Sequence, residues 1–458
     1  MAEFKPTRSQ QAAIETRGRA VLVSAAAGSG KTKVLTERLL SRISDDADID
    51  SFLIITFTKA AAAELKSRIV DEIAKRLAAE PDNRRLRRQS ALCQKAQIGT
   101  IHSFCAAFLR ENCHEAGLSP EFKVIEEDRS EAIRARVIGR VMDAAYEKPT
   151  PEFLLLADSV GAGRDDSRLA EIVLSLHKKM QSHARPDLWA KKQIELMSVG
   201  ADDIAATPWA QEILHCVTAS AGFWAQAMED AAQKAYSNEK IGAAYGESLS
   251  ATALGLRDLA RSSADGWDRA RQFLPIEFPK LKSLRNSPDP ELSEHIKALR
   301  DSCKKAAGKL ADMLSASEEK LASDMQKTAP AMRALLELTL DFDKAYAAEK
   351  KRRAEVDFAD LEHFTARLLT DEAGEPTALA RELSQRYTEI MVDEYQDVNR
   401  VQDAIFRAVS KDGTNLFMVG DVKQSIYRFR LADPGIFLDK YNRYADASDA
   451  PDGAPRRI

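Results

Sequence analysis

The chain has 458 residues, of which 44% are hydrophobic and 30% charged, with a formal net charge of −4. This composition is typical of globular domains, and the length allows two or three of them. Because the net charge is small, overall charge alone gives no reason to predict nucleic-acid binding. No apolar run approaches the ~20 residues of a membrane span, and the polar N-terminal segment and five scattered cysteines favour a cytoplasmic protein without a disulfide framework.

The first informative stretch is VLVSAAAGSGKTKVL, residues 21–35, which reads as a strand, a loop and a helix. Ala25 to Thr32 match the phosphate-loop pattern A-x-x-x-x-G-K-T, with alanine in place of the usual first glycine. The N–H groups of such a loop and the dipole of the following helix can surround a phosphate. Lys31 is therefore predicted to reach the β- and γ-phosphates of a nucleotide, and Thr32 to ligate Mg²⁺.

Apolar runs further along the chain predict a parallel sheet that is buried on both faces. The predicted strands are residues 20–24, 52–56, 389–393 and 415–420. The segment from about 120 to 345 is instead rich in Ala, Leu, Lys and Glu, with apolar residues at helical spacing. We therefore predict one α/β domain, formed by residues 1–115 and 349–458, that is interrupted by a helical domain at residues 116–348.

The stretch IMVDEYQD places two acidic residues at the end of a predicted strand. Asp393 is positioned to bind Mg²⁺, and Glu394 to activate the water that attacks the γ-phosphate. Gln424, in the later stretch MVGDVKQSIYRFR, could donate a hydrogen bond to that phosphate. A phosphate-loop kinase or GTPase is disfavoured, because those families do not place these stretches in this order.

Two further patterns each allow two interpretations. Tyr427 and Phe429 alternate with Arg428 and Arg430, which suits a stacking platform for single-stranded bases, although this segment alone favours core aromatics with surface arginines. Nine basic residues between 64 and 95 suit a phosphate-binding track but equally a solvated helix face.

The ordered set of motifs resembles the superfamily 1 DNA helicases of the UvrD/Rep/PcrA group. The motifs are PTRSQQAAI, SAAAGSGKT, TFTKAAAAELKSRI (56–69), IGTIHSFC (98–105), VDEYQDVN (392–399) and GDVKQSIYRFR (420–430). Among these helicases the sequence is most similar to the AddA-type subunit of the AddAB helicase–nuclease, also in DFADLEHF (357–364) and FMVGDVKQSIYRFRLADPGIFL (417–438). The resemblance implies a RecA-like ATPase fold with a helical insertion, and ATP and Mg²⁺ as cofactors.

The resemblance also assigns roles to individual residues. The positions that contact the nucleotide are Gln10, Ala25, Ala26, Ala27, Gly28, Ser29, Gly30, Lys31, Thr32, Lys33 and Arg430. The catalytic positions are Lys31, Asp393, Glu394 and Gln424, and the metal ligands are Thr32 and Asp393. The positions that touch single-stranded DNA are Phe57, Thr58, His102, Tyr427 and Phe429.

Three residues depart from the common UvrD pattern. Phe429 replaces a tryptophan and Leu431 replaces a glycine, and both changes fit the AddA type. Lys33 replaces an arginine near the adenine and cannot stack as a planar guanidinium does.

The resemblance implies a 3′-to-5′ DNA helicase that acts in double-strand break repair and recombination on single-stranded or duplex-end DNA, and whose partner is an AddB-like nuclease subunit. The motor of this family has two RecA-like domains, and we expect the second of them, and the nuclease domain, to be absent from these 458 residues. The alternative is therefore a nucleotide- and single-stranded DNA-binding module without motor activity of its own.

Overall fold

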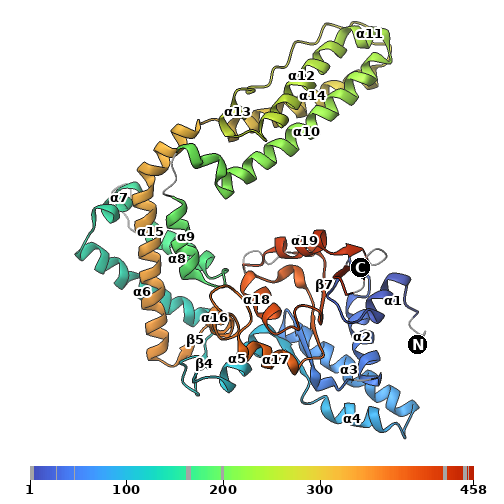
Figure 1. Cartoon of the computed structure of the whole chain (residues 1–458), viewed down its shortest axis with the longest axis vertical. Helices are drawn as coiled ribbons and strands as arrows, with labels where there is room; N and C mark the ends of the chain where they lie inside the picture. Colours follow the sequence, from blue (N-terminus) through green and yellow to red (C-terminus); the bar gives the residue numbers. More distant parts are fainter. Residues whose placement is uncertain are drawn as a thin grey trace. The chain divides into compact units, whose positions relative to one another are not determined.

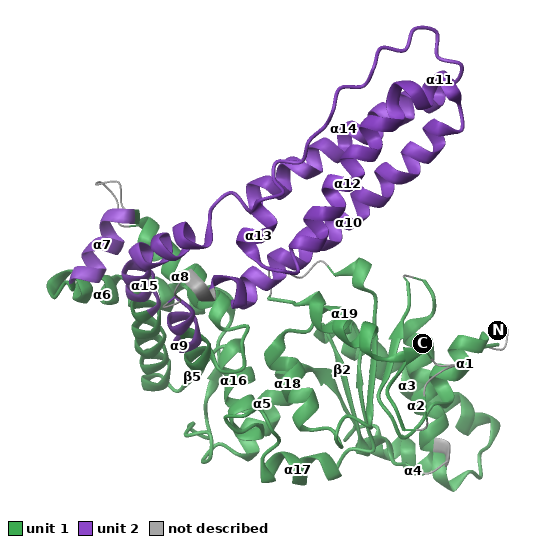
Figure 2. Ribbon diagram, turned by 45° about the horizontal axis from the view of Figure 1, so that its top comes forward, with its two compact units in different colours: residues 1–150, 160–190, 337–458 green, residues 151–159, 191–336 purple. Residues whose placement is uncertain are grey.

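The fold is seen in a computed structural model. It describes residues 5–26, 28–45, 47–160, 167–197, 201–425, 431–446, 451 and 453–458. Within these residues the chain divides into two compact units, which Figure 2 colours separately: unit 1 comprises residues 1–150, 160–190 and 337–458, and unit 2 comprises residues 151–159 and 191–336.

Unit 1 contains a parallel sheet that is seven-stranded in the described part of the chain, with the order β3-β2-β6-β7-β1-β9-β8. Its strands are β1 (Val21–Ser24), β2 (Phe52–Thr56), β3 (Gln97–Thr100), β6 (Glu389–Val392), β7 (Leu416–Gly420), β8 (Ala445–Asp446) and β9 (Arg456–Arg457). The four predicted strands are confirmed to within a residue and lie in this one sheet. The prediction missed the edge strand β3 and the two-residue strands β8 and β9.

Side chains alternate between the two faces of the sheet, and each face is covered by its own helices (Figure 1). The helices around the sheet are α1 (Arg8–Glu15), α2 (Lys31–Asp45), α3 (Lys59–Ala79), α4 (Arg84–Leu92), α5 (Ile101–Glu111), α16 (Phe358–Leu369), α17 (Ala378–Gln385), α18 (Arg400–Ala408) and α19 (Pro434–Arg443). Short 3₁₀ turns are η1 (Ile49–Ser51), η4 (Tyr395–Asp397) and η5 (Val422–Gln424). Val21 and Val23 pack on one face with α1, α2 and α3, whereas Leu22 packs on the other with α5, α16 and α18. The strands therefore read as continuous apolar runs because both of their faces are buried.

Unit 1 also includes helices from the segment that was predicted to be a separate helical domain. They are α6 (Glu127–Glu147) and α8 (Ser167–Met180) entirely, together with parts of α7 (Pro151–Val160), α9 (Pro186–Leu196) and α15 (Glu318–Arg352), and the small sheet of β4 (Lys123–Val124) and β5 (Glu355–Val356). The division at residues 116 and 348 stays a prediction, since the compact units group residues 116–150, 160–190 and 337–348 with the sheet.

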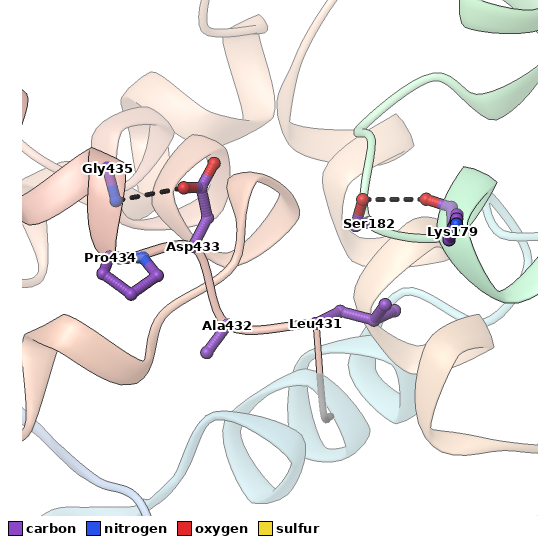
Figure 3. A pocket seen from close by; sticks show the side chains of 7 residues that line it. All are labelled: Lys179, Ser182, Leu431, Ala432, Asp433, Pro434 and Gly435. Atoms are coloured by element: carbon purple, nitrogen blue, oxygen red, sulfur yellow. Dashed lines mark hydrogen bonds between the residues drawn. The ribbon is translucent and has the colours of Figure 1, made fainter. Parts of the chain in front are cut away.

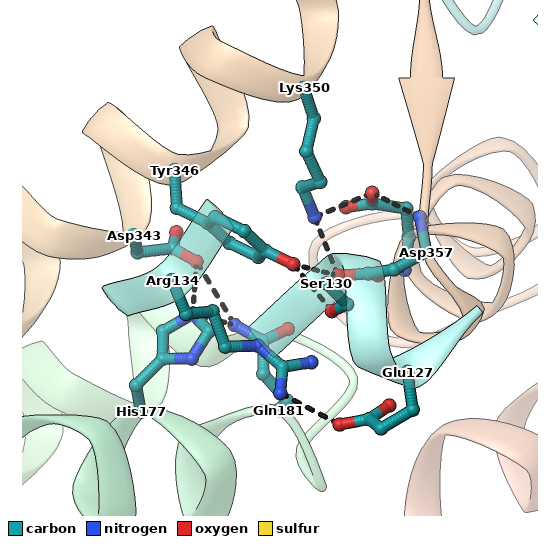
Figure 4. A network of polar contacts seen from close by, with 10 residues as sticks. Glu127, Ser130, Arg134, His177, Gln181, Asp343, Tyr346, Lys350 and Asp357 are labelled. Atoms are coloured by element: carbon teal, nitrogen blue, oxygen red, sulfur yellow. Dashed lines mark hydrogen bonds and ion pairs between the residues drawn. The ribbon is translucent and has the colours of Figure 1, made fainter. Parts of the chain in front are cut away.

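A buried polar network joins the C-terminal end of α15 to α16 and α6 (Figure 4). The Lys350 ammonium donates to Asp357 at 2.9 Å and to Asp360 at 2.6 Å, and the Tyr346 hydroxyl donates to Asp357 at 2.8 Å. Ser130 of α6 lies 2.8 Å from the same Tyr346 hydroxyl. Burial alone would lower the pKa of Lys350, but the carboxylates of Asp360 and Asp357 raise it above its ordinary value. Lys350 therefore fixes the start of α16 through a buried charge that is paired.

Unit 2 is helical and has its own apolar core, formed mainly by α10 (Pro208–Tyr236), α12 (Glu247–Ser262) and α14 (Pro290–Met313). Shorter helical segments complete it: η2 (Ala201–Ala206), α11 (Glu239–Ile241), the π-helical turn η3 (Gly242–Gly246) and α13 (Trp267–Arg271). The Tyr236 ring lies against Gly246, where an added Cβ would approach it to 2.4 Å. Among the described helices, none has a stretch that is both long and apolar enough to cross a bilayer.

Candidate functional site

The predicted phosphate loop joins β1 to α2, as the sequence indicated. It leaves the sheet beside β7, where the Ala25 N–H donates to the Gly420 carbonyl at 3.1 Å. Gly28 and Gly30 have φ values of +76° and +85°, a region that suits glycine. Lys31 and Thr32 then open α2, whose first N–H groups have no carbonyl of their own helix to bond. The loop and the helix N-terminus thus offer the donors that a phosphate requires, and Ala27 lies outside the described residues.

The side chain of Gln10 is hydrogen-bonded to this loop. Thr7 and Gln10 form a reciprocal cap at the start of α1, and the Gln10 side-chain amide donates to the Ser29 carbonyl at 2.9 Å. An added Cβ on Gly30 would lie 3.4 Å from the same amide nitrogen. Gln10 is therefore held against the phosphate loop, and its contact with adenine stays a prediction.

We expect Gly30→Ala to weaken nucleotide binding about 5- to 30-fold, because a left-handed backbone costs a residue with a Cβ about 1–2 kcal/mol. Titration of a fluorescent ATP analogue measures this loss. Gly18→Ala is the matched control, since Gly18 also has positive φ (+68°) but lies before β1 with open space around it. Equal nucleotide affinities for both variants would contradict this role of Gly30.

The acidic pair lies at the end of β6, and Glu394 meets the lysine of the phosphate loop. The Lys31 ammonium is 3.4 Å from the Glu394 Oε2 atom, although 363 residues separate them in the sequence. Glu394 has a left-handed backbone (φ 52°, ψ 44°), a conformation that costs a non-glycine residue of order 1–3 kcal/mol and is concentrated at functional sites. The two predicted catalytic residues are therefore brought together.

Asp393 is fixed to a neighbouring strand and lies next to Glu394 in the sequence. Its N–H donates to the Ile55 carbonyl at 2.9 Å, which fixes it to β2. Burial and then the neighbouring charge of Glu394 raise the pKa of the Asp393 carboxyl to about 6. No cluster of three or more His, Cys, Asp or Glu side chains able to hold a metal occurs in the described residues. Mg²⁺ typically binds through one or two carboxylates together with phosphate oxygens and water. Asp393 has such a carboxylate, and the Thr32 hydroxyl is a further oxygen donor.

Gln396, which the sequence analysis did not single out, joins the ends of β6 and β7. The side-chain Nε2 of Gln396 donates to Glu394 Oε2 at 2.8 Å, and its side-chain Oε1 accepts from the Asp421 N–H at 2.9 Å. Gly420 permits this contact, since a Cβ there would lie 2.5 Å from that oxygen. The Gln424 amide donates to the Asp421 carboxylate, and this hydrogen bond lowers the pKa of Asp421. Gln424 is thus held at the end of β7 by Asp421, and its bond to a γ-phosphate stays a prediction.

The predicted DNA-contacting residues follow the neighbouring strands β2 and β3. Phe57 is half-buried, and the exposed Thr58 caps α3 by accepting from the Ala61 N–H at 3.0 Å. His102, 34% exposed in the first turn of α5, lies 3.0 Å from the carboxylate of Glu362. Because the strands are parallel, these residues share the carboxyl-terminal edge of the sheet with the phosphate loop, which is where α/β sheets bind ligands. Tyr427, Phe429 and Arg430 lie outside the described residues.

The basic residues of α3 and α4 are mostly used within the fold. Arg85 donates to the Ile43 carbonyl at 2.7 Å, and Arg88 pairs with Asp48 at 2.6 Å. Further ion pairs join Arg68 to Glu64, Arg76 to Glu37, Lys75 to Glu72 and Arg87 to Asp82. These partners favour the helix-face interpretation of the charge run over a phosphate-binding track.

A pocket of about 540 Å³ adjoins the N-terminus of α19 (Figure 3). It is lined by Lys179, Ser182, Leu431, Ala432, Asp433, Pro434 and Gly435. Leu431 has φ +66°, which explains why glycine suits this position in the common UvrD pattern. Asp433 accepts from the Gly435 N–H at 3.0 Å and from Arg400 at 3.0 Å. The Asp433 carboxylate in the pocket wall therefore already has partners in the fold.

Comparison with known proteins identifies the relatives of this chain. The sequence model of the family described as UvrD/REP helicase N-terminal domain matches residues 6–445. Three similar proteins each carry the name of an ATP-dependent helicase/nuclease subunit: those of Desulforudis audaxviator (39% identical, covering 99% of this chain and 38% of that protein), Clostridium novyi (36%, 98% and 37%) and Heliobacterium modesticaldum (36%, 96% and 33%). The chain thus spans about a third of the length of these curated relatives.

Proposed function

Because the chain belongs to the family of the UvrD/REP helicase N-terminal domain, we propose that it binds ATP with Mg²⁺ and single-stranded DNA as part of an ATP-dependent DNA helicase. The observation that carries this proposal is the meeting of Lys31 and Glu394 at 3.4 Å on the edge of the sheet. One residue comes from the phosphate loop and the other from the acidic loop after β6. Phosphoryl transfer to water needs both a phosphate-binding cation and a group that orients the water.

Each residue of this site has its own role in binding and hydrolysing ATP. Lys31 exchanges its Glu394 partner for the β- and γ-phosphates, which frees the Glu394 carboxylate to orient the attacking water. Mg²⁺, when bound, neutralises phosphate charge, and Thr32 and Asp393 are the residues that would hold it. Gln424 donates to the γ-phosphate, and the loop amides from Ala25 to Gly30 hold the remaining oxygens. Gln10 and Lys33 contact the nucleotide beyond the phosphates.

Single-stranded DNA is proposed to contact Phe57, Thr58 and His102 at the ends of β2 and β3. From the sequence resemblance, Tyr427 and Phe429 add stacking contacts, and Arg430 connects the two ligands. Stacking on aromatic side chains is tolerant of sequence, because every base has a π-face. This arrangement suits a motor that moves along a strand without reading it.

The finer proposals rest on the sequence resemblance and on the names of the relatives. They are 3′-to-5′ movement, a role in double-strand break repair and recombination, cytoplasmic localisation and an AddB-like nuclease partner. The alternative is a module that binds nucleotide and single-stranded DNA but does no mechanical work by itself. Phosphate release with and without single-stranded DNA separates the two, because only a motor is stimulated by the strand.

Lys31→Ala tests the nucleotide site directly. We expect the Kd for an ATP analogue to rise about 10- to 150-fold, because a hydrogen bond to a charged group contributes roughly 1.5–3 kcal/mol. The Kd for a single-stranded oligonucleotide in the absence of nucleotide should stay close to that of the parent. Lys59→Ala is the matched control, since Lys59 also opens a helix after a parallel strand. Unchanged nucleotide affinity in the Lys31 variant would overturn the proposed site.

A further inference from the structure

Glu362 is a buried carboxylate on α16 that none of the assigned roles uses. Its side chain is 7% exposed, and three side chains donate to it. His102 Nε2 lies 3.0 Å and Gln402 Nε2 lies 2.6 Å from Oε1, while Asn399 Nδ2 lies 2.9 Å from Oε2. Burial alone would raise the pKa of Glu362, but the hydrogen bonds from His102, Asn399 and Gln402 hold it below its usual value. The carboxylate is therefore ionised in the interior.

One donor belongs to the proposed DNA-contacting residues, and the other two belong to the helix that follows the acidic loop. His102 belongs to the first turn of α5 after β3, where DNA is proposed to bind. Asn399 caps α18, accepting from the Gln402 N–H at 2.8 Å, and this helix begins directly after the acidic loop at residues 393–399. Glu362 is thus bonded at once to the proposed DNA-contacting residue and to the end of the loop that carries Glu394.

Within that loop the hydrogen bonds continue to the nucleotide site. Gln396 donates to Asp397 at 3.0 Å and to Glu394 Oε2 at 2.8 Å. Glu394 in turn lies 3.4 Å from Lys31. The path from His102 to Lys31 therefore runs through Glu362, Asn399, the backbone of the loop, Gln396 and Glu394.

Burial alone does not account for a carboxylate at this position. A buried charge has a large desolvation cost, and well-packed apolar residues often stabilise a core as well or better. Only an ionised carboxylate accepts from three donors at once, because it offers acceptor sites on both oxygens and no competing N–H. His102 remains 34% exposed while its partner is buried, so a ligand can reach the imidazole.

We propose that Glu362 is a positioning residue that couples DNA binding at His102 to the geometry of the acidic loop at the nucleotide site. A strand that engages the imidazole changes its contact with Glu362. Because the same carboxylate holds Asn399 and Gln402, that change is passed to the start of α18 and the loop before it. This inference rests on the proposed function, since it needs both ligands to bind.

The test is a linkage measurement on the full 458-residue chain. The Kd of a fluorescent oligo(dT) is measured with and without saturating Mg²⁺ and a non-hydrolysable ATP analogue, and the ratio of the two values is the coupling factor. We expect the parent ratio to differ from one by at least about fivefold, as is common for coupled sites, and Glu362→Gln to bring it within about twofold of one. Glutamine carries an NH₂ group in place of one oxygen, so it must lose either Asn399 or the other two donors.

Three further measurements separate coupling from simple damage. The nucleotide Kd without DNA should stay within about twofold in the Glu362→Gln variant, since a positioning residue changes the linkage and not the site. Glu355→Gln, which also alters a carboxylate that is 7% exposed and paired with an arginine, should keep the parent ratio. Gln402→Leu removes a donor on the α18 side without altering His102 and should also bring the ratio closer to one.

The possible outcomes are distinct. A parent ratio of one, or a parent-like ratio in the Glu362→Gln and Gln402→Leu variants, would overturn the coupling role of Glu362. If Glu362→Gln alone unfolds in a thermal melt, the Gln402→Leu ratio decides the question. A parent chain that binds neither oligo(dT) nor the ATP analogue would instead contradict the proposed function itself.

Discussion

Glu394→Gln is expected to lower ATP hydrolysis about 10²- to 10⁴-fold, the usual contribution of a positioned general base. Glutamine keeps the size of the side chain but cannot accept a proton from the attacking water. Nucleotide affinity should remain close to that of the parent, because Lys31 loses a competing partner at 3.4 Å and stays available to the phosphates. The measurement is phosphate release with Mg²⁺-ATP and single-stranded DNA, together with a nucleotide titration.

Asp412→Asn is a suitable control for this variant. Asp412 is another acidic residue with a left-handed backbone (φ 50°), but it is exposed in the turn before β7. Its replacement should change neither hydrolysis nor binding. If Glu394→Gln hydrolysed ATP at the parent rate, Glu394 would have no part in activating water, and another group would have to be sought.

The elements around the nucleotide site were predictable because their signals are local. The change from apolar residues to glycine and then to Gly30-Lys31-Thr32 marks a strand, a loop and a helix within fifteen residues. Asp393 follows an apolar run whose burial on both faces also predicts a parallel sheet. Parallel strands end at the same edge of a sheet. A parallel sheet therefore places the loops that carry Lys31 and Glu394 at that edge.

The partners of individual side chains were not predictable in the same way. His102 and Glu362, or Gln396 and the Asp421 N–H, are brought together by packing, and nothing in either segment specifies the other. Charge runs are ambiguous for the same reason: Arg85 and Arg88 look available for phosphate in the sequence, yet the fold places carbonyls and Asp48 against them.

The edges of the sheet and the division of the helical region show a second limit. Strands β8 and β9 have two residues each, too few for any periodicity to appear. Helical spacing in the segment from 120 to 345 predicts helices but not which core each of them joins. The long helix α15 contributes residues to both compact units, so that boundary lies inside a helix, and neither of the helix ends marks it.

Arg38→Met is expected to lower the stability of the sheet by about 3–5 kcal/mol, because removing one partner leaves a buried charge unpaired. The side chain of Arg38 is fully buried in α2, and its Nε lies 3.0 Å from Glu389 Oε2 at the start of β6. It also donates to the Ala13 carbonyl of α1 at 2.6 Å and lies over the Phe417 ring of β7 at 4.4 Å. Urea-dependent hydrogen exchange of peptides from β1, β6 and β7 measures the loss, and peptides from α10 and α12 serve as an internal reference.

Variants of the partner residue Glu389 separate the contribution of charge to stability from that of packing. Glu389→Leu alone should destabilise the sheet much as Arg38→Met does, since it leaves the guanidinium unpaired. The double variant Arg38→Met/Glu389→Leu should recover most of the loss, because apolar residues of similar volume often replace a buried ion pair at little cost. The exposed pair Arg88–Asp48 is the control, and Arg88→Met should have a much smaller effect. Equal losses for the double and single variants would mean that Arg38 acts through its carbonyl and ring contacts. In that case the anchoring of the phosphate-loop helix to the start of β6 would not depend on charge.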